Sequence, residues 1–151
     1  MDIRDGGLDE PRVLALLEHH AAMNEEVTPK GSCHYFCVSR LKEEDIEFFS
    51  AWDVDVLLGV GAWKRIDEAH GEVKSMHTSE RARRRGVGGA ILAVIMERAR
   101  QAGIERLSLE TGSMDYFAPA RRLYAANGFA ECPPFGDYRP DPNSIFMTRR
   151  I

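Results

Sequence analysis

The sequence has 151 residues, the usual size of one domain and too few for two ordinary ones. Its composition, 44% hydrophobic and 29% charged residues, is that of a folded chain and excludes extended disorder. The formal net charge of −4 excludes a general attraction to nucleic acid or anionic membranes, which needs a surplus of Lys and Arg. We therefore expect one domain over residues 1–151.

Cellular location and metal content follow from two further features. No apolar run approaches the roughly 20 residues that span a bilayer, and the acidic N-terminus does not resemble a signal peptide. The cysteines Cys33, Cys37 and Cys132 are odd in number and form no Cys-x-x-Cys pair. We expect a cytoplasmic protein with reduced thiols and no bound metal.

The first half of the chain predicts a helix followed by antiparallel strands. Pro11–Glu26 carries apolar side chains at helical spacing behind a proline suited to a first turn, and Thr28–Ser32 has loop chemistry. Ile46–Trp52 and Val56–Ile66 are rich in strand-forming residues around a short polar turn, which predicts a hairpin. The alternating segment Glu72–Thr78 predicts the next antiparallel strand.

The second half alternates strands with helices. A helical pattern runs from Gly86 to a stop at Gly103, and Glu105–Thr111 predicts a short strand. Phe117–Asn127 predicts another helix, and Ser144–Arg150 predicts a last strand. This order predicts an α/β (α+β) fold in which helices pack on a mixed sheet.

The segment Arg81–Ala90, rich in arginine and glycine, lies between a predicted strand and the long helix. A helix N-terminus bears about half a positive charge, so each arginine there costs about 0.3–1 kcal/mol unless an anion binds. Gly86, Gly88 and Gly89 allow a tight turn and a close approach to main-chain amides. The segment therefore predicts a pyrophosphate site.

Other interpretations of this segment stay open to different degrees. It is also consistent with a solvated basic turn whose glycines serve only the chain reversal. A dinucleotide-binding turn is disfavoured because Ile91 occupies its third glycine position, and the Gly-Lys-Ser/Thr of a Walker loop is absent. A nucleic-acid patch is disfavoured because the chain is acidic and no aromatic residue lies among the arginines.

Two motifs resemble those of a known family. Arg83–Gly88 resembles the Arg/Gln-x-x-Gly-x-Gly/Ala signature with which GCN5-related N-acetyltransferases (GNATs) hold the coenzyme A pyrophosphate. Leu123–Phe129 is similar to their Tyr-x-x-x-Gly-Phe segment, at a typical separation. Gly71–Met76, Leu109–Ser113 and Asp141–Met147 are similar to segments of small bacterial members. The resemblance implies a GNAT-like mixed, mostly antiparallel sheet with helices on both faces.

The resemblance also implies a site for acetyl-CoA as cosubstrate. Main-chain groups around Met76 and His77, on a strand that splays from its neighbour, are expected to bind the pantetheine arm and polarise the thioester. Tyr124 matches the family tyrosine that acts as general acid on the coenzyme sulfur, although its helical spacing also fits a core residue. The cofactor-binding residues that we expect are Met76, His77, Arg83, Arg84, Arg85, Gly86, Val87, Gly88, Gly89, Ala90 and Asn127.

The general base is less well specified. An alkylammonium must lose a proton before it attacks, and Glu72 precedes Arg83 by the same interval as the catalytic glutamate of histone-modifying members. Glu72 is equally consistent with a strand-end residue paired with Lys74 or an arginine. His70 and His77 are competing bases, and Glu110 is a candidate for shaping the acceptor pocket.

The leading hypothesis is an N-acetyltransferase that moves acetyl directly to an unidentified primary amine in a ternary complex, since no cysteine lies on the site segments. The alternative is a non-catalytic acetyl-CoA-binding or sensing module, and a nucleotide binder is weaker still. We expect a small-molecule or peptide acceptor bound by the opening helix, Thr28–Cys37 and Pro133–Asn143. No nucleic-acid or membrane partner is expected, and a homodimer stays open.

Overall fold

The computed structural model describes residues 1–28, 41–42 and 45–151. Most of the predicted loop Thr28–Ser32, with Cys33 and Cys37, lies outside these residues. The described chain forms a seven-stranded sheet in the order β1-β2-β3-β4-β5-β7-β6, in which only β4 and β5 pair in parallel. The strands are β1 (Asp2–Asp5), β2 (Ile46–Asp53), β3 (Val56–Arg65), β4 (His70–Thr78), β5 (Arg106–Gly112), β6 (Ala130–Glu131) and β7 (Ser144–Arg150). The mixed, mostly antiparallel sheet is confirmed.

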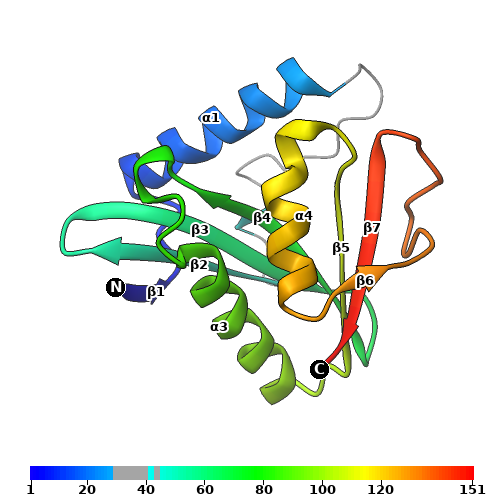
Figure 1. Cartoon of the computed structure of the whole chain (residues 1–151). Coiled ribbons are helices and arrows are strands. Elements are labelled where there is room, and N and C mark those ends of the chain that lie inside the picture. The colour runs from blue at the N-terminus through cyan, green and yellow to red at the C-terminus, as the bar shows by residue number, and fades with distance from the viewer. Residues whose placement is uncertain (29–40, 43–44) are drawn as a thin grey trace.

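Helices cover both faces of this sheet. They are α1 (Pro11–Val27), α3 (Val87–Gln101) and α4 (Ala118–Ala126), with 3₁₀ turns η1 (Glu80–Ala82) and η2 (Asp115–Phe117). One buried cluster joins α1 to Phe48 and Val60, and a larger one joins α3 and α4 to Phe49 and Leu107 on the opposite face (Figure 1). In the described part of the chain, no helix has the length and apolarity needed to cross a membrane.

The sequence did not predict the two edge strands of the sheet, β1 and β6. β1 pairs with β2 from Asp2↔Trp52 to Asp5↔Phe49, and β6 contributes only Ala130 and Glu131 to the edge beside β7. Both strands are polar or very short, and edge strands pair through main-chain groups rather than through an alternating apolar pattern. Side-chain periodicity therefore carries no signal for them.

The sheet opens between β4 and β5. Their pairing runs only from His70↔Arg106 to Glu72↔Ser108, and beyond this point the two strands diverge behind α4 (Figure 1). The β3–β4 register also shifts, since Val60 faces His77 whereas Ala62 faces Lys74. A β-bulge of this kind bends a strand and re-aims its side chains.

Two glycines of β3 permit this bend. A Cβ on Gly59 would lie 2.9 Å from the carbonyl oxygen of His77, and one on Gly61 would lie 2.6 Å from the sulfur of Met76. Ser75, between the paired positions, has φ +55°, which is uncommon for a residue with a side chain. β3 therefore supplies the space into which the bulged part of β4 fits.

Candidate active site

The arginine–glycine turn forms the N-terminus of α3. Gly86 is its N-cap with φ +76°, and the amide of Ala90 donates to the carbonyl oxygen of Gly86 at 3.1 Å. The amides of Val87, Gly88 and Gly89 precede this first helical hydrogen bond and have no partner within the helix. Arg84 also has a positive φ, +65°. The turn thus presents several amide donors in succession, as anion sites at helix ends do.

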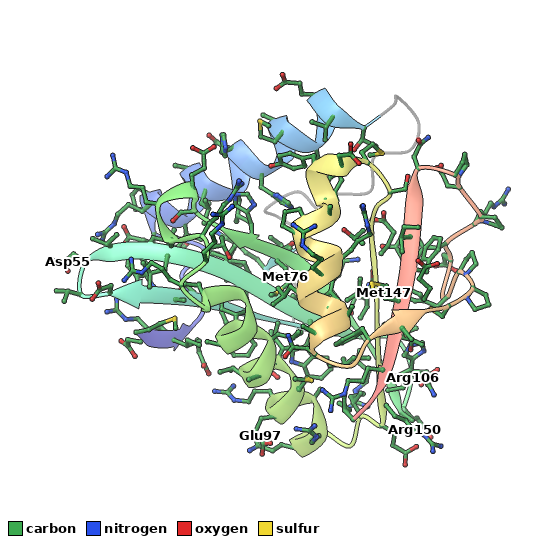
Figure 2. The ribbon with its side chains drawn as sticks, viewed as in Figure 1. Asp55, Met76, Glu97, Arg106, Met147 and Arg150 are labelled. Carbon is green, nitrogen blue, oxygen red and sulfur yellow. The ribbon has the colours of Figure 1, made fainter. Side chains whose placement is uncertain are left out.

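A cavity of about 580 Å³ begins at this turn. Its walls are the turn, the end of β4 from Met76 to Thr78, and one face of η2 and α4; Met76 is labelled beside α4 in Figure 2. The predicted cofactor residues that line this cavity are Met76, His77, Arg83, Arg84, Gly86, Val87, Gly88 and Gly89. One space therefore collects most of the predicted set.

Three predicted cofactor residues do not line this cavity. Arg85 points to the β2–β3 hairpin, where its Nη2 lies 3.6 Å from Oδ2 of Asp53. Ala90 lies one helical turn into α3. Asn127 ends α4, and its side-chain nitrogen donates to the carbonyl oxygen of Leu123 at 2.8 Å. The structure gives Asn127 a capping role that is common for this residue type.

Two histidines close the cavity on the α1 side. The rings of His20 and His77 lie 4.4 Å apart, and Nδ1 of His20 is buried without a hydrogen-bond partner among the described residues. Burial, with the neighbouring His19, lowers the pKa of His20 to about 4. Burial, with His20 and Arg83, lowers the pKa of His77 to about 3. Both rings are therefore neutral at physiological pH.

A smaller cavity of about 120 Å³ lies in the opening between β4 and β5. It shares Met76, Phe117 and Tyr124 with the larger cavity, so the two spaces meet at these side chains. Its remaining wall includes Glu72 and Glu110 from the two diverging strands. The splay that the family resemblance implied is thus a lined passage into the sheet.

Tyr124 lies where the two cavities meet. Its side chain is buried and packs edge-on against Phe129, with ring centroids 5.9 Å apart. Burial, and then the charge of Glu110, raises the pKa of Tyr124 above its ordinary value. The hydroxyl therefore stays protonated at neutral pH and is available as a donor. Tyr124 is at once a core residue and a cavity residue.

Glu72 is held by two donors. Its Oε2 accepts a hydrogen bond from the hydroxyl of Tyr138 at 2.7 Å and lies 2.9 Å from Nζ of Lys74. The side chain of Lys74 is 8% exposed and that of Glu72 is 10% exposed. Burial lowers the pKa of Lys74, and the charge of Glu72 opposes that change. The Lys74 pairing weighed from the sequence is therefore present, and it lies inside the passage.

Glu110 faces the same passage from β5. Burial, with the charge of Glu72, raises the pKa of Glu110 to about 7, and the charge of Lys74 opposes this rise. A carboxyl group with a pKa near neutrality exchanges protons readily at physiological pH. Glu110 is therefore a stronger candidate for proton transfer than the sequence indicated.

A third cavity, of about 630 Å³, lies on the far side of Glu72 and Lys74. Its walls are the end of β3 from Lys64 to Ile66 and the segment from Phe135 to Asp141. Glu72, Lys74 and Tyr138 line both this cavity and the central one. The three cavities therefore form a series, with the turn of α3 at one end and the Phe135–Asp141 segment at the other.

Sequence reasoning missed the roles of His20, Lys74 and Tyr138 in these walls. His20 and Lys74 carried only ordinary helix and strand signals, and Tyr138 lies in a segment without a diagnostic pattern. Gly59 and Gly61 gave a usable signal, because glycine inside a strand pattern often marks a bulge or a close backbone approach. The predicted acceptor loop Thr28–Cys37 lies, apart from Thr28, outside the described residues.

Comparisons with known proteins agree with this architecture. A family model described as the acetyltransferase (GNAT) family matches residues 13–129. The uncharacterized N-acetyltransferase YsnE of Bacillus subtilis (strain 168) is 45% identical over 151 residues, 100% of both chains. The uncharacterized N-acetyltransferase YedL of Escherichia coli (strain K12) is 40% identical over 146 residues, 97% of this chain and 92% of that protein.

A solved structure from Klebsiella pneumoniae, described as an acyl-CoA N-acyltransferase, has a similar fold. It has a TM-score of 0.82 and 27% identity, over 99% of this chain and 96% of that one. The ranges matched by the family model and by the YsnE relative include the residues of the turn, β4, β5 and α4. The chain belongs to the acetyltransferase (GNAT) family and is an enzyme of acetyl transfer.

Proposed function

We propose that the protein transfers an acetyl group from acetyl-CoA directly to a primary amine, with both substrates bound together. The observation that carries this proposal is the series of three cavities through the open sheet. The anion-binding turn at one end suits the coenzyme pyrophosphate, and the third cavity gives an acceptor its own entrance. The reacting groups then meet beside Tyr124.

The coenzyme site that we propose uses main-chain donors for the pyrophosphate and the bulged part of β4 for the pantetheine arm. Arg83 and Arg84 line the same cavity and supply positive charge beside the amides of Val87, Gly88 and Gly89. A main-chain amide near Met76 or His77 polarises the thioester carbonyl as negative charge develops on its oxygen.

The hydroxyl of Tyr124 acts on the departing coenzyme sulfur in this proposal. Because burial raises its pKa, complete proton transfer would leave a costly buried phenolate. A strong hydrogen bond to the developing thiolate, with the proton moving late, avoids that cost. This role depends on the hydroxyl group of Tyr124 and not on the packing of its ring.

Glu72 is the base that we propose for the acceptor ammonium, directly or through water. Both of its donors bind Oε2, and no donor among the described residues binds Oε1. Glu110 is the competing base, favoured by its pKa of about 7. If Glu110 is the base, the acidic limb of the kcat/KM profile should fall near pH 7 and should disappear in Glu110→Gln but persist in Glu72→Gln.

Release of coenzyme A thiol, measured with a panel of amines, amino acids and peptides, tests the activity. Transfer requires release well above the rate without an acceptor for at least one amine class. The second candidate, a module that binds acetyl-CoA without turnover, would instead show tight binding by calorimetry and no acceptor-dependent release. The raised pKa of Glu110 beside Tyr124 favours catalysis, because groups tuned towards neutrality gather at active sites.

A further inference from the structure

Lys74 brings an amine of the chain itself into the proposed reaction centre. Its side chain lines the central cavity together with Tyr124, and it lines the acceptor cavity as well. On β4 it precedes Met76, which lines the coenzyme cavity, by two positions. The Lys74 side chain thus borders both the central cavity, where we propose that the thioester reacts, and the cavity assigned to an acceptor.

The surroundings of Lys74 resemble those that an amine substrate needs. Nζ lies 2.9 Å from Oε2 of Glu72, a carboxylate that is itself fixed by the hydroxyl of Tyr138. Nζ also lies 6.0 Å from the centre of the Tyr138 ring. A proton acceptor therefore contacts this amine, and an aromatic ring lies near it.

The lowered pKa of Lys74 also favours reaction at this lysine over other lysines. Burial lowers the pKa of Lys74, so a larger fraction of this amine is neutral than for an exposed lysine. Glu72 and Glu110 oppose this change and Lys64 supports it. Only a neutral amine attacks a thioester, and buried lysines serve as nucleophiles elsewhere for this reason.

We propose that Lys74 is a self-acetylation site, modified by acetyl-CoA bound to the same chain when no acceptor occupies the third cavity. This inference rests on the proposed acetyl-CoA site. The Lys74 ammonium gives one proton to Glu72, and the neutral Nζ attacks the thioester carbonyl carbon. A C–N bond forms and the C–S bond breaks, with its electron pair leaving on sulfur. The nitrogen loses a second proton and the sulfur gains one, so the products are acetyl-Lys74, coenzyme A thiol and one proton.

Acetylation of Lys74 has a structural consequence. The amide product carries no charge, so the pair with Glu72 is lost and the acceptor cavity gains an acetyl group in its wall. Breaking a buried ion pair on one side leaves the other charge uncompensated, which is costly in a protein interior. We therefore expect acetylated protein to bind amine acceptors more weakly than unmodified protein.

Intact-mass measurement and peptide mapping of the full chain incubated with acetyl-CoA alone test this proposal. We expect one added acetyl group at Lys74, at a rate at least about ten-fold above that at Lys42 or Lys64. The side chains of Lys42 and Lys64 are 49% and 34% exposed, so uncatalysed acetylation favours them over Lys74. Chain unfolded in denaturant gives the uncatalysed pattern and should lose the preference for Lys74.

Variants separate the possible causes. Lys74→Arg keeps the positive charge beside Glu72 and should abolish the single modification, whereas Tyr124→Phe should slow it while leaving Lys74 in place. Acetyl-CoA binding is measured by calorimetry on the same samples. Binding of acetyl-CoA with Lys74 unmodified, or modified no faster than Lys42, would overturn the self-acetylation proposal. Absence of binding would instead overturn the proposed coenzyme site.

Discussion

Single side chains around the opening between β4 and β5 divide the proposed chemistry among them. Tyr124 faces the coenzyme side, Glu72 and Lys74 face the acceptor side, and Glu110 lies across the opening from β5. Each is wholly or partly buried, so each interaction acts in a medium less polarisable than water. Changes to these side chains should therefore alter rate and pH dependence more than coenzyme affinity.

Tyr124→Phe should lower turnover by about ten-fold or more, because the hydroxyl that stabilises the coenzyme thiolate is lost while the ring remains. The Kd for acetyl-CoA should stay nearly unchanged. Steady-state rates and calorimetry measure the two quantities. Tyr116→Phe is a matched control, since Tyr116 lines the coenzyme cavity but not the central one. Equal turnover in the wild type and Tyr124→Phe would remove the role assigned to Tyr124.

Glu110→Gln should make the protein more resistant to unfolding at pH 8 than the wild type. Burial raises the folded-state pKa of Glu110 from 4.5 to about 7, so the folded state binds the proton more tightly than the unfolded state. The contribution of Glu110 to wild-type stability is therefore lost between about pH 4.5 and 7 as the pH rises. Melting temperatures at pH 5 and pH 8 measure the effect. A variant that melts no higher than the wild type at pH 8 would contradict the buried environment of Glu110.

The N-terminus of α3 is the element on which the coenzyme proposal depends. Gly86 at this end and Gly103 beyond the other end both have positive φ, +76° and +85°. A Cβ would meet no heavy atom within 4 Å at either position. The two sites thus offer the same backbone strain, about 1 kcal/mol for a residue with a side chain, at opposite ends of one helix.

Gly86→Ala should weaken acetyl-CoA binding at least about ten-fold, because its methyl group would stand where we propose that the pyrophosphate approaches the amides. Gly103→Ala should lower the melting temperature similarly but leave the Kd unchanged. Calorimetry and thermal melts on both variants separate strain from ligand contact. Equal affinities in the two variants would place the pyrophosphate away from the turn.

The two buried histidines between α1 and β4 should lower the free energy of unfolding as the pH falls. His20 and His77 have folded-state pKa values lowered to about 4 and about 3, so the unfolded state binds more protons below pH 6.5. The contribution of these histidines to stability is therefore fully present above pH 6.5 and is lost as the pH falls towards 4, by up to about 1.4 kcal/mol per pH unit for each histidine. Denaturant unfolding between pH 7 and 4.5 measures the slope. His77→Phe should flatten it, and an unchanged slope would locate the effect elsewhere.

The sheet as a whole joins both ends of the chain. β1 begins at Asp2 and β7 ends at Arg150, and β7 lies in the same sheet beside β5 (Figures 1 and 2). The first and third cavities each share wall residues with the central cavity, so the three do not belong to separate halves. We therefore propose that residues 1–151 fold as one unit and that ligand binding stabilises the whole unit.

The protein should unfold in a single transition, and acetyl-CoA should shift that whole transition. A ligand at 100 times its Kd adds about 2.7 kcal/mol to the free energy of unfolding when it binds only the folded state. Calorimetric melts with and without acetyl-CoA measure this, and free coenzyme A is the control for acetyl-specific contacts. Two separate transitions, with only one shifted by the ligand, would contradict the single unit.

Local sequence determined most of the helices and strands and the arginine–glycine turn at the start of α3. Helical spacing in Pro11–Glu26 and the stop at Gly103 agree closely with α1 and α3, because amphipathic patterns and glycine stops act within a few residues of chain. The glycines at the start of α3 also act through local backbone conformation, so the sequence alone predicts the turn.

Only the tertiary structure decided which groups meet across the opening. The hydrogen bond from Tyr138 to Glu72, the raised pKa of Glu110 and the contact of His20 with His77 join segments that are distant in the chain. Burial sets these interactions, and burial depends on how β4 departs from β5 after Glu72. No local pattern encodes that departure, so the acid–base environment emerges only when the sheet is assembled.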